Sequence, residues 1–277
     1  MSVSIRPRPL ILLVACAAIV SGGCSLSARR GGGDVTGSIP GGAYTEQTAR
    51  GEIEGLAARY RSSPEDAANA MRYGRALRAT GQAAQAVAVL ERVAIRDPRN
   101  LALMGEYGRA LADVGRHEQA LQVLGRAHRP DQPDWRIYNV QASIYDQMGR
   151  STEAQALYND ALKIAPGEPS VLANLGLSHA LSRQLPQAEQ ALRQAAAHPR
   201  ADRRVRQNLA LVVGLQGRFA EAEEIARKDL PPAEAEQNVA YLRSMVTQQN
   251  SWAAIRQSER RGAPQRPAAP APAQPRG

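Results

Sequence analysis

A period of 34 residues runs through the middle of this 277-residue chain and constrains its fold more than any other feature. Two series of small residues recur at that spacing, with one member of each in every unit. The first series is Gly74, Gly108, Ala142, Gly176 and Ala210, and the second is Ala86, Ala120, Ala154, Ala188 and Ala222. A further series is Gly81, Gly115, Gly149 and Gly217, with Arg183 in the remaining place. Self-similarity of this kind indicates a repeat protein whose units stack on one another.

Bulky residues and prolines keep the same register. The bulky residues are Tyr73, Tyr107, Leu175 and Leu209, then Leu90, Leu124, Tyr158 and Leu192; Pro98 and Pro166 close two units, and Pro133 and Pro199 lie one residue out of register. This order resembles the tetratricopeptide repeat, in which two antiparallel helices form each unit. The small residues allow close helix approach, the glycine permits the turn, and the proline ends the second helix. We therefore predict an all-α TPR solenoid, a right-handed superhelix with repeats at 67–100, 101–134, 135–168, 169–202 and 203–236.

Weaker helical patterns flank the five repeats. Leu56 and Pro64 continue two of the series one period upstream, so residues 46–66 are expected to form an N-terminal capping helix. Residues 237–258 place apolar side chains at helical spacing and are expected to cap the other end. The Pro- and Ala-rich composition of residues 259–277 predicts a disordered tail.

The chain begins like a bacterial lipoprotein precursor. Arg6 and Arg8 precede an apolar run from Leu10 to Val20, and small residues follow, which is the order of a secretory signal. The small-small-Cys arrangement after this run resembles the lipobox, whose cysteine receives a diacylglyceryl group. We therefore expect residues 1–23 to be a lipoprotein signal peptide and Cys24 to be the lipid attachment site.

Two alternatives to lipidation of Cys24 remain open. Ser21 stands where lipoboxes usually carry Leu, so ordinary signal cleavage after Gly23, leaving a free thiol, explains the same segment. Cys16 has the better preceding residues but leaves an apolar run shorter than the usual ~7–15 residues. Residues 24–45 are rich in glycine and predict a flexible tether. Ser25 in place of Asp agrees with sorting of a lipoprotein to the outer membrane.

Composition argues against catalysis and against nucleic-acid binding. The formal net charge is +9, but Arg6 and Arg8 contribute two of these charges in the leader, and the tail contributes a net three. The four histidines occupy unrelated places in the repeats: His117, His128, His179 and His198. None has a cysteine partner, and no acid recurs from repeat to repeat at metal-ligand or triad spacing. We predict that the protein is not an enzyme, has no cofactor or metal beyond a covalent lipid, and binds neither nucleic acid nor a small-molecule substrate.

Polar residues on the first helix of each repeat are candidates for partner binding, because these helices line a groove in such solenoids. Arg75 and Arg109 are one period apart and are expected to face solvent along that groove, where paired guanidinium groups suit a peptide carboxylate. The other candidates on first helices are Asn139, Ser143, Asp146, Asn174, Arg204 and Asn208, of which the asparagines are suited to hydrogen bonds with an extended backbone. An ordinary solvated groove wall explains the same residues equally well.

Longer stretches resemble one family within the repeat class. Residues 131–150 (DQPDWRIYNVQASIYDQMGR), 164–196, 204–232 and 238–245 (NVAYLRSM) are similar to TadD, the lipoprotein family of the tight-adherence (Tad, Flp) pilus assembly system. The resemblance implies a pilotin-like scaffold on the periplasmic face of the outer membrane, without a reaction of its own. Its partners would be the pilus secretin or other Tad components. The alternatives are an adaptor that recruits a periplasmic peptidase or cell-wall hydrolase and, for location, a soluble periplasmic protein.

Overall fold

The computed structural model describes residues 45–129 and 131–262, all of which belong to one compact unit, residues 34–277. The expected signal peptide, Cys24, the tether up to residue 44 and the tail from residue 263 lie outside the described residues. The described part contains twelve α-helices and no strand; an isolated β-bridge joins Arg129 and Gln132.

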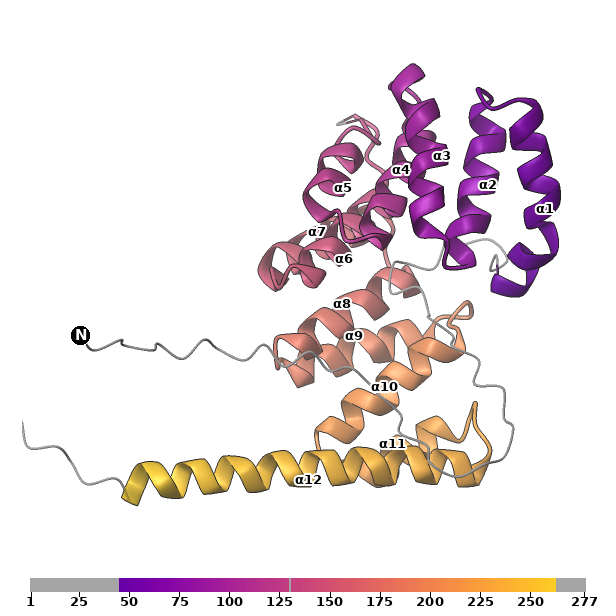
Figure 1. The fold of residues 1–277 in the computed structure, drawn as a ribbon. Helices are drawn as coiled ribbons and strands as arrows, with labels where there is room; N and C mark the ends of the chain where they lie inside the picture. The colour runs from indigo at the N-terminus through magenta and orange to yellow at the C-terminus, as the bar shows by residue number, and fades with distance from the viewer. Residues whose placement is uncertain (1–44, 130, 263–277) are drawn as a thin grey trace, which may run out of the picture. The chain divides into compact units, whose positions relative to one another are not determined.

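The helices follow one another along the chain with short connections (Figure 1). They are α1 Glu46–Ser62, α2 Ala67–Ala79, α3 Ala83–Arg96, α4 Leu101–Asp113, α5 His117–Leu124, α6 Trp135–Gln147, α7 Ser151–Ile164, α8 Pro169–Leu181, α9 Leu185–Ala197, α10 Arg203–Leu215, α11 Phe219–Ala226 and α12 Pro232–Gly262.

The helices pair as the 34-residue period predicts. Helices α2 and α3 pack together, as do α4 and α5, α6 and α7, α8 and α9, and α10 and α11, so each repeat has a first and a second helix. Each first helix also contacts the first helix of the next repeat, and α12 packs on α10 and α11. We call α2, α4, α6, α8 and α10 the first-helix row. The expected all-α TPR solenoid is confirmed.

Glycine in a first helix allows its partner helix to approach closely. A Cβ atom added to Gly108 of α4 would lie 2.5 Å from Leu124 Cγ of α5, and one added to Gly176 of α8 would lie 2.6 Å from Leu192 Cγ of α9. Real Cβ atoms do not approach so closely, so the leucine side chain or one of the two helices would have to shift. The repeated small residue thus sets the spacing within a repeat.

Helix starts also repeat every 34 residues. The first helices of the repeats are capped by Asp66, Asn100, Asp134, Glu168 and Asp202, whose side chains accept hydrogen bonds from backbone N–H groups in the first turn. Such caps satisfy donors that the helix itself leaves unpaired. The turn before each second helix has a residue with positive φ. This residue is glycine in the first, second, third and fifth repeats, and it is Arg183, at φ 61°, in the fourth repeat. A residue other than glycine adopts this conformation at a cost of about 1–2 kcal/mol.

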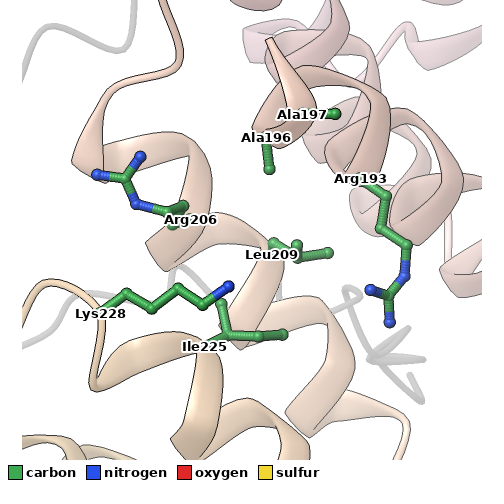
Figure 2. A pocket seen from close by; sticks show the side chains of 7 residues that line it. All are labelled: Arg193, Ala196, Ala197, Arg206, Leu209, Ile225 and Lys228. Atoms are coloured by element: carbon green, nitrogen blue, oxygen red, sulfur yellow. The ribbon is translucent and has the colours of Figure 1, made fainter. Parts of the chain in front are cut away.

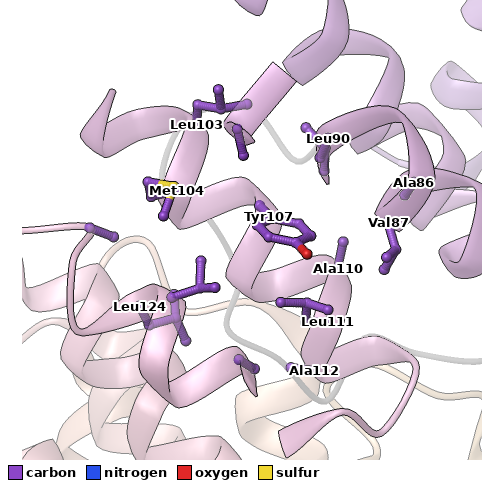
Figure 3. Close-up of a cluster of buried hydrophobic side chains, with 14 of the residues drawn as sticks. Ala86, Val87, Leu90, Leu103, Met104, Tyr107, Ala110, Leu111, Ala112 and Leu124 are labelled. Atoms are coloured by element: carbon purple, nitrogen blue, oxygen red, sulfur yellow. The ribbon is translucent and has the colours of Figure 1, made fainter. Parts of the chain in front are cut away.

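Alanine, leucine and valine fill most of the core. Figure 3 shows part of the cluster that extends from α2 to α6, where Leu90 of α3, Tyr107 and Leu111 of α4, and Leu124 of α5 come together. Separate clusters lie among α6, α7 and α8 and among α8 to α12. The core is therefore a series of interfaces between neighbouring helices, as expected for stacked repeats.

Two second helices are shorter than the rest. Helices α5 and α11 have eight residues each, whereas α3, α7 and α9 have 13 or 14. Helix α5 ends at Leu124, directly before Gly125, and α11 ends at Ala226. Helix α12 then begins at Pro232, inside the range 203–236 expected for the fifth repeat, and continues to Gly262. Proline is well suited to the first helical position because the N–H it lacks would have no partner there.

Candidate functional site

The first-helix row changes in chemistry along the chain. At the repeat place of Arg75 in α2, the later repeats carry Arg109, Ser143, Leu177 and Leu211. At the repeat place of Ala79 they carry Asp113, Gln147, Leu181 and Leu215. The row is therefore charged on α2 and α4 and apolar at these places on α8 and α10. We call α2 with α4 the charged end, and α8 with α10 the apolar end.

Glu106 of α4 is the centre of the charged end. Its side chain is 3% exposed, and its Oε1 atom lies 2.9 Å from Arg75 Nε and accepts a hydrogen bond from Arg109 Nη1 at 3.1 Å. Arg78 Nη1 lies 3.8 Å from the other oxygen of Glu106, and Arg78 Nε donates to Asp113 Oδ2 at 2.5 Å. Three guanidinium groups from α2 and α4 thus surround two carboxylates of α4. Arg75, whose side chain is 45% exposed, is the guanidinium of this group that an anionic group on a partner can reach.

The expectation that Arg75 and Arg109 both face solvent is wrong for Arg109. The Arg75 side chain is 45% exposed, whereas that of Arg109 is 11% exposed. Burial lowers the pKa of Arg109 below its ordinary value; Glu106 opposes this change, and the charges of Arg78 and Arg75 add to it. Spacing placed Arg109 in the row but did not reveal that its side chain is buried. Replacing both arginines with Glu would bury a second carboxylate beside Glu106 and would perturb the fold as well as binding.

Predicted residues of α6 and α8 bind one another. Asn174 Nδ2 donates to Asn139 Oδ1 at 3.0 Å, and Ser178 Oγ donates to Asp146 Oδ1 at 2.8 Å. Asn139 is 3% exposed and Ser143 is 4% exposed, so neither offers much surface to a partner. These hydrogen bonds join neighbouring repeats. They give the candidate asparagines a structural role that sequence spacing did not indicate.

Asp146 links three helices through hydroxyl groups. Burial raises the pKa of this carboxyl above its ordinary value, while hydrogen bonds from Ser178, Tyr158 and Ser151 act in the opposite direction. Burial likewise raises the pKa of Tyr158 well above its ordinary value, and Ser143 also forms a hydrogen bond with its hydroxyl. The middle of the row is thus an internally satisfied polar network.

The apolar end exposes leucine side chains that sequence reasoning missed. Leu181 at the end of α8 is 70% exposed, and Leu211 in the middle of α10 is 43% exposed. The predicted residues of α10 lie on the same helix, with Arg204 exposed and Asn208 half-buried. The signal that reveals Leu181 and Leu211 is their register, because they replace Asp113 and Arg109 of the charged end. Exposed leucines along two packed helices suit the apolar face of a partner segment.

One group of ion pairs at the apolar end is centred on Glu189 of the second helix α9. The Glu189 carboxylate of α9 is bound by Arg193, Arg218 and Gln216, with donor–acceptor distances of 2.7 to 2.8 Å. Burial by itself raises the pKa of Glu189, but the hydrogen bonds from Gln216, Arg193 and Arg218 prevail and lower it to about 2. Glu189 therefore joins the fourth repeat to the fifth as a carboxylate.

Residues 45–129 and 131–262 contain no group of three or more His, Cys, Asp and Glu side chains arranged to hold a metal ion. In the same part of the chain, none of the helices combines the length and the apolar composition needed to cross a membrane.

Comparison with known proteins agrees with the helix pairs. Three tetratricopeptide repeat models match the chain, at residues 77–144, 136–168 and 204–228. A search of the curated proteins finds no match.

Several solved structures are similar in fold. A thermophilic TPR protein of Thermus thermophilus is 22% identical, with a TM-score of 0.54, and the match covers 66% of this chain and 99% of that one. The structure described as the functional characterization of Pseudomonas aeruginosa pilF is 17% identical, with a TM-score of 0.50, covering 65% and 86%. A chain of the APC/C hetero-tetramer Cut9–Hcn1 is 14% identical, with a TM-score of 0.59, covering 74% of this chain and 40% of that one.

At these identities the solved structures speak for the fold alone. The repeat models, the helix pairs and the close contacts at the recurring glycines agree on that fold. The described residues therefore form an all-α tetratricopeptide-repeat solenoid, with the first helices of successive repeats packed in a row.

Proposed function

We propose that this protein is a membrane-anchored periplasmic scaffold that assembles a Tad/Flp pilus secretion system by binding a partner along its first-helix row. The observation that carries the binding site is the change along the row, from the half-exposed Arg75 at the charged end to the exposed Leu181 and Leu211 at the apolar end. The partner segment that fits this row has an acidic group at one end and apolar side chains at the other.

The pilus assignment and the anchor are supported by sequence. Residues 131–150, 164–196 and 204–232 resemble the TadD family, and the lipobox-like segment before Cys24 supplies the anchor. In this proposal the chain acts by binding alone, from the periplasmic face of the outer membrane. The partner is the pilus secretin or another Tad assembly component.

Crosslinking in the cells that make the protein, followed by identification of the captured partners, tests the pilus assignment. Recovery of the secretin or another pilus-assembly protein is the expected result. Recovery of a periplasmic peptidase or cell-wall hydrolase in its place would overturn the pilus assignment and favour the adaptor alternative. A Leu211→Asp variant shows whether capture depends on the first-helix row. It places a charge on the apolar end and should reduce capture of a partner bound there.

The anchor has a test of its own. Cys24→Ser should abolish incorporation of a labelled fatty acid and release the protein into the soluble periplasm, because several acyl chains are what hold such a protein on a membrane. The matched control is Cys16→Ser, which should still incorporate the label. Continued labelling of Cys24→Ser would show that the anchor lies elsewhere.

A further inference from the structure

A hollow of about 250 Å³ opens between α9, α10 and α11 (Figure 2). Its floor is apolar, with Leu209 of α10, Ile225 of α11 and two alanines of α9. The rest of the lining is basic and consists of Arg193, Arg206 and Lys228. Among the described residues, no acidic side chain lines the hollow. Because α9 and α11 are second helices, the hollow belongs to a different surface from the exposed leucines of the first-helix row.

The fifth repeat has this hollow because its second helix is short and its side chains do not fill the space. The second repeat has an equally short second helix, α5, and allows a direct comparison. There the equivalent of Leu209 is Tyr107, and the equivalent of Arg193 is Glu91. The Tyr107 hydroxyl donates to Glu91 Oε1 at 2.8 Å, so the longer side chain occupies the space and is fixed by a hydrogen bond. In the fifth repeat neither the tyrosine nor its acceptor is present.

The three cations around the hollow differ in what already binds them. Arg193 contacts Glu189 and Glu221, and Arg206 makes two hydrogen bonds of 2.7 Å with Asp229. Lys228 has no ion pair within 4.0 Å in the described part of the chain. Figure 2 shows its side chain extending toward Leu209 and Ile225. The Lys228 ammonium group is therefore the donor that an incoming anion can use at the edge of the apolar floor.

We propose that this hollow binds the C-terminal residue of a partner protein, with an apolar side chain on the floor and its α-carboxylate at Lys228. The volume is below the ~300–1,000 Å³ of pockets for drug-sized ligands and suits a single side chain. Lys228 lies directly beside the floor, so the charge and the apolar group must come from one residue. The C-terminal residue of a protein carries both groups, since its α-carboxylate and its side chain are attached to the same Cα atom. The site goes beyond the proposed function, because it gives the scaffold a second binding surface that does not depend on the first-helix row.

The test measures binding of short labelled peptides to the purified full-length protein by fluorescence anisotropy. The probes are fluorescein-GSGSAL with a free C-terminus, the same peptide amidated, and fluorescein-GSGSAG with a free C-terminus. Loss of the charge-assisted contact should weaken binding of the amidated peptide by about tenfold or more. Loss of the apolar side chain should weaken binding of the glycine-ended peptide by a similar factor, about tenfold.

Three variants locate the binding to the hollow. Lys228→Glu should weaken binding of the free leucine peptide by about tenfold or more, because attraction becomes repulsion. Leu209→Tyr should abolish it by placing in the hollow the side chain that fills the second repeat. Lys163→Glu, which makes the same charge change on the exposed end of α7, should leave it unchanged.

Circular dichroism of each variant shows that the helices are intact. If Leu209→Tyr does not fold, the binding measured with the exposed variant Lys228→Glu and with the amidated peptide decides the test. Equal binding of the free and amidated peptides, wild-type binding by Lys228→Glu, or no saturable binding to the wild-type protein up to about 1 mM would each overturn the proposal.

Discussion

At the charged end of the first-helix row, Glu106 is 3% exposed and lies among three arginines; at the apolar end, Leu181 and Leu211 are 70% and 43% exposed. Leu181 and Leu211 occupy the same repeat places as Asp113 and Arg109. The backbone of a repeat is set by its small residues, which face the partner helix, so the places along the row are free to differ. At the charged end Arg75, Glu106 and Arg109 of the first helices form ion pairs with one another, whereas Glu189 of the apolar end, on a second helix, pairs with Arg193 and Arg218.

The largest loss of stability is expected when the Glu106 carboxylate, at the centre of the charged end, is removed. Glu106→Ala removes the carboxylate that is ion-paired with the buried Arg109 and should lower the free energy of unfolding by about 3–5 kcal/mol. Urea denaturation followed by circular dichroism measures this change.

Glu65→Ala is the matched control for Glu106→Ala. Glu65 forms ion pairs with Arg92 and Arg96, but its side chain is 41% exposed. Its loss should cost no more than about 1 kcal/mol. Equal effects of the two substitutions would contradict the assignment of Glu106 as the centre of the charged end.

Close helix approach should be common to both ends. Gly108→Ala at the charged end and Gly176→Ala at the apolar end each add a Cβ atom within 2.6 Å of a leucine side-chain carbon, and each should lower the unfolding free energy by about 1–3 kcal/mol. Thermal denaturation of both variants checks this. Gly55→Ala in α1, where nothing lies within 4 Å of the added atom, should instead stabilise by about 0.5–1 kcal/mol. A large difference between Gly108→Ala and Gly176→Ala would show that the two ends do not share one packing scheme.

Acid should weaken the link between the fourth and fifth repeats through Glu189. Its pKa is lowered from 4.5 to about 2 in the folded chain, so its contribution to stability is complete above pH 4.5 and is lost as the pH falls toward 2. Glu189→Gln should be less stable than wild type at pH 7, and the two should converge near pH 2. Denaturation curves over this pH range measure the difference, with Glu118→Gln on the exposed surface of α5 as the control. A constant difference between Glu189→Gln and wild type at all pH values would refute the role of this carboxylate.

The smallest effect on stability is expected at the exposed leucines. Leu181→Ser changes a side chain that is 70% exposed and should alter the unfolding free energy by no more than about 0.5 kcal/mol. Denaturation of the purified variant measures this. A loss of several times that size would mean that Leu181 belongs to the core and is not available to a partner.

The sequence period was sufficient to predict the helix pairs and the close approach at Gly108 and Gly176. The caps of the first helices recur at the same spacing, at Asp66, Asn100, Asp134, Glu168 and Asp202, and this recurrence is a further signal of helix starts. Glu106 was missed because a single acid in a first helix looks like an ordinary solvated residue. Its importance depends on arginines of the preceding repeat, which become neighbours only when the repeats stack.

The 34-residue period does not predict the lengths of the helices. The 34-residue spacing continues through the second and fifth repeats, although α5 and α11 end early. The early end of α11 leaves room for Pro232 to begin α12 within the expected range of the fifth repeat. The filled space beside Tyr107 and the hollow beside Leu209 follow from local side-chain size, which a pattern of small residues does not describe.

Site-specific photo-crosslinking tests the central claim, that a partner binds along the first-helix row, most directly. A photoreactive amino acid is placed at Leu211, on the apolar end of the row, or at Ile95 of α3, which is 75% exposed on a second helix. The account predicts partner adducts from position 211 and none from position 95. Adducts from position 95 with none from position 211 would contradict it and would place partner binding on the second helices.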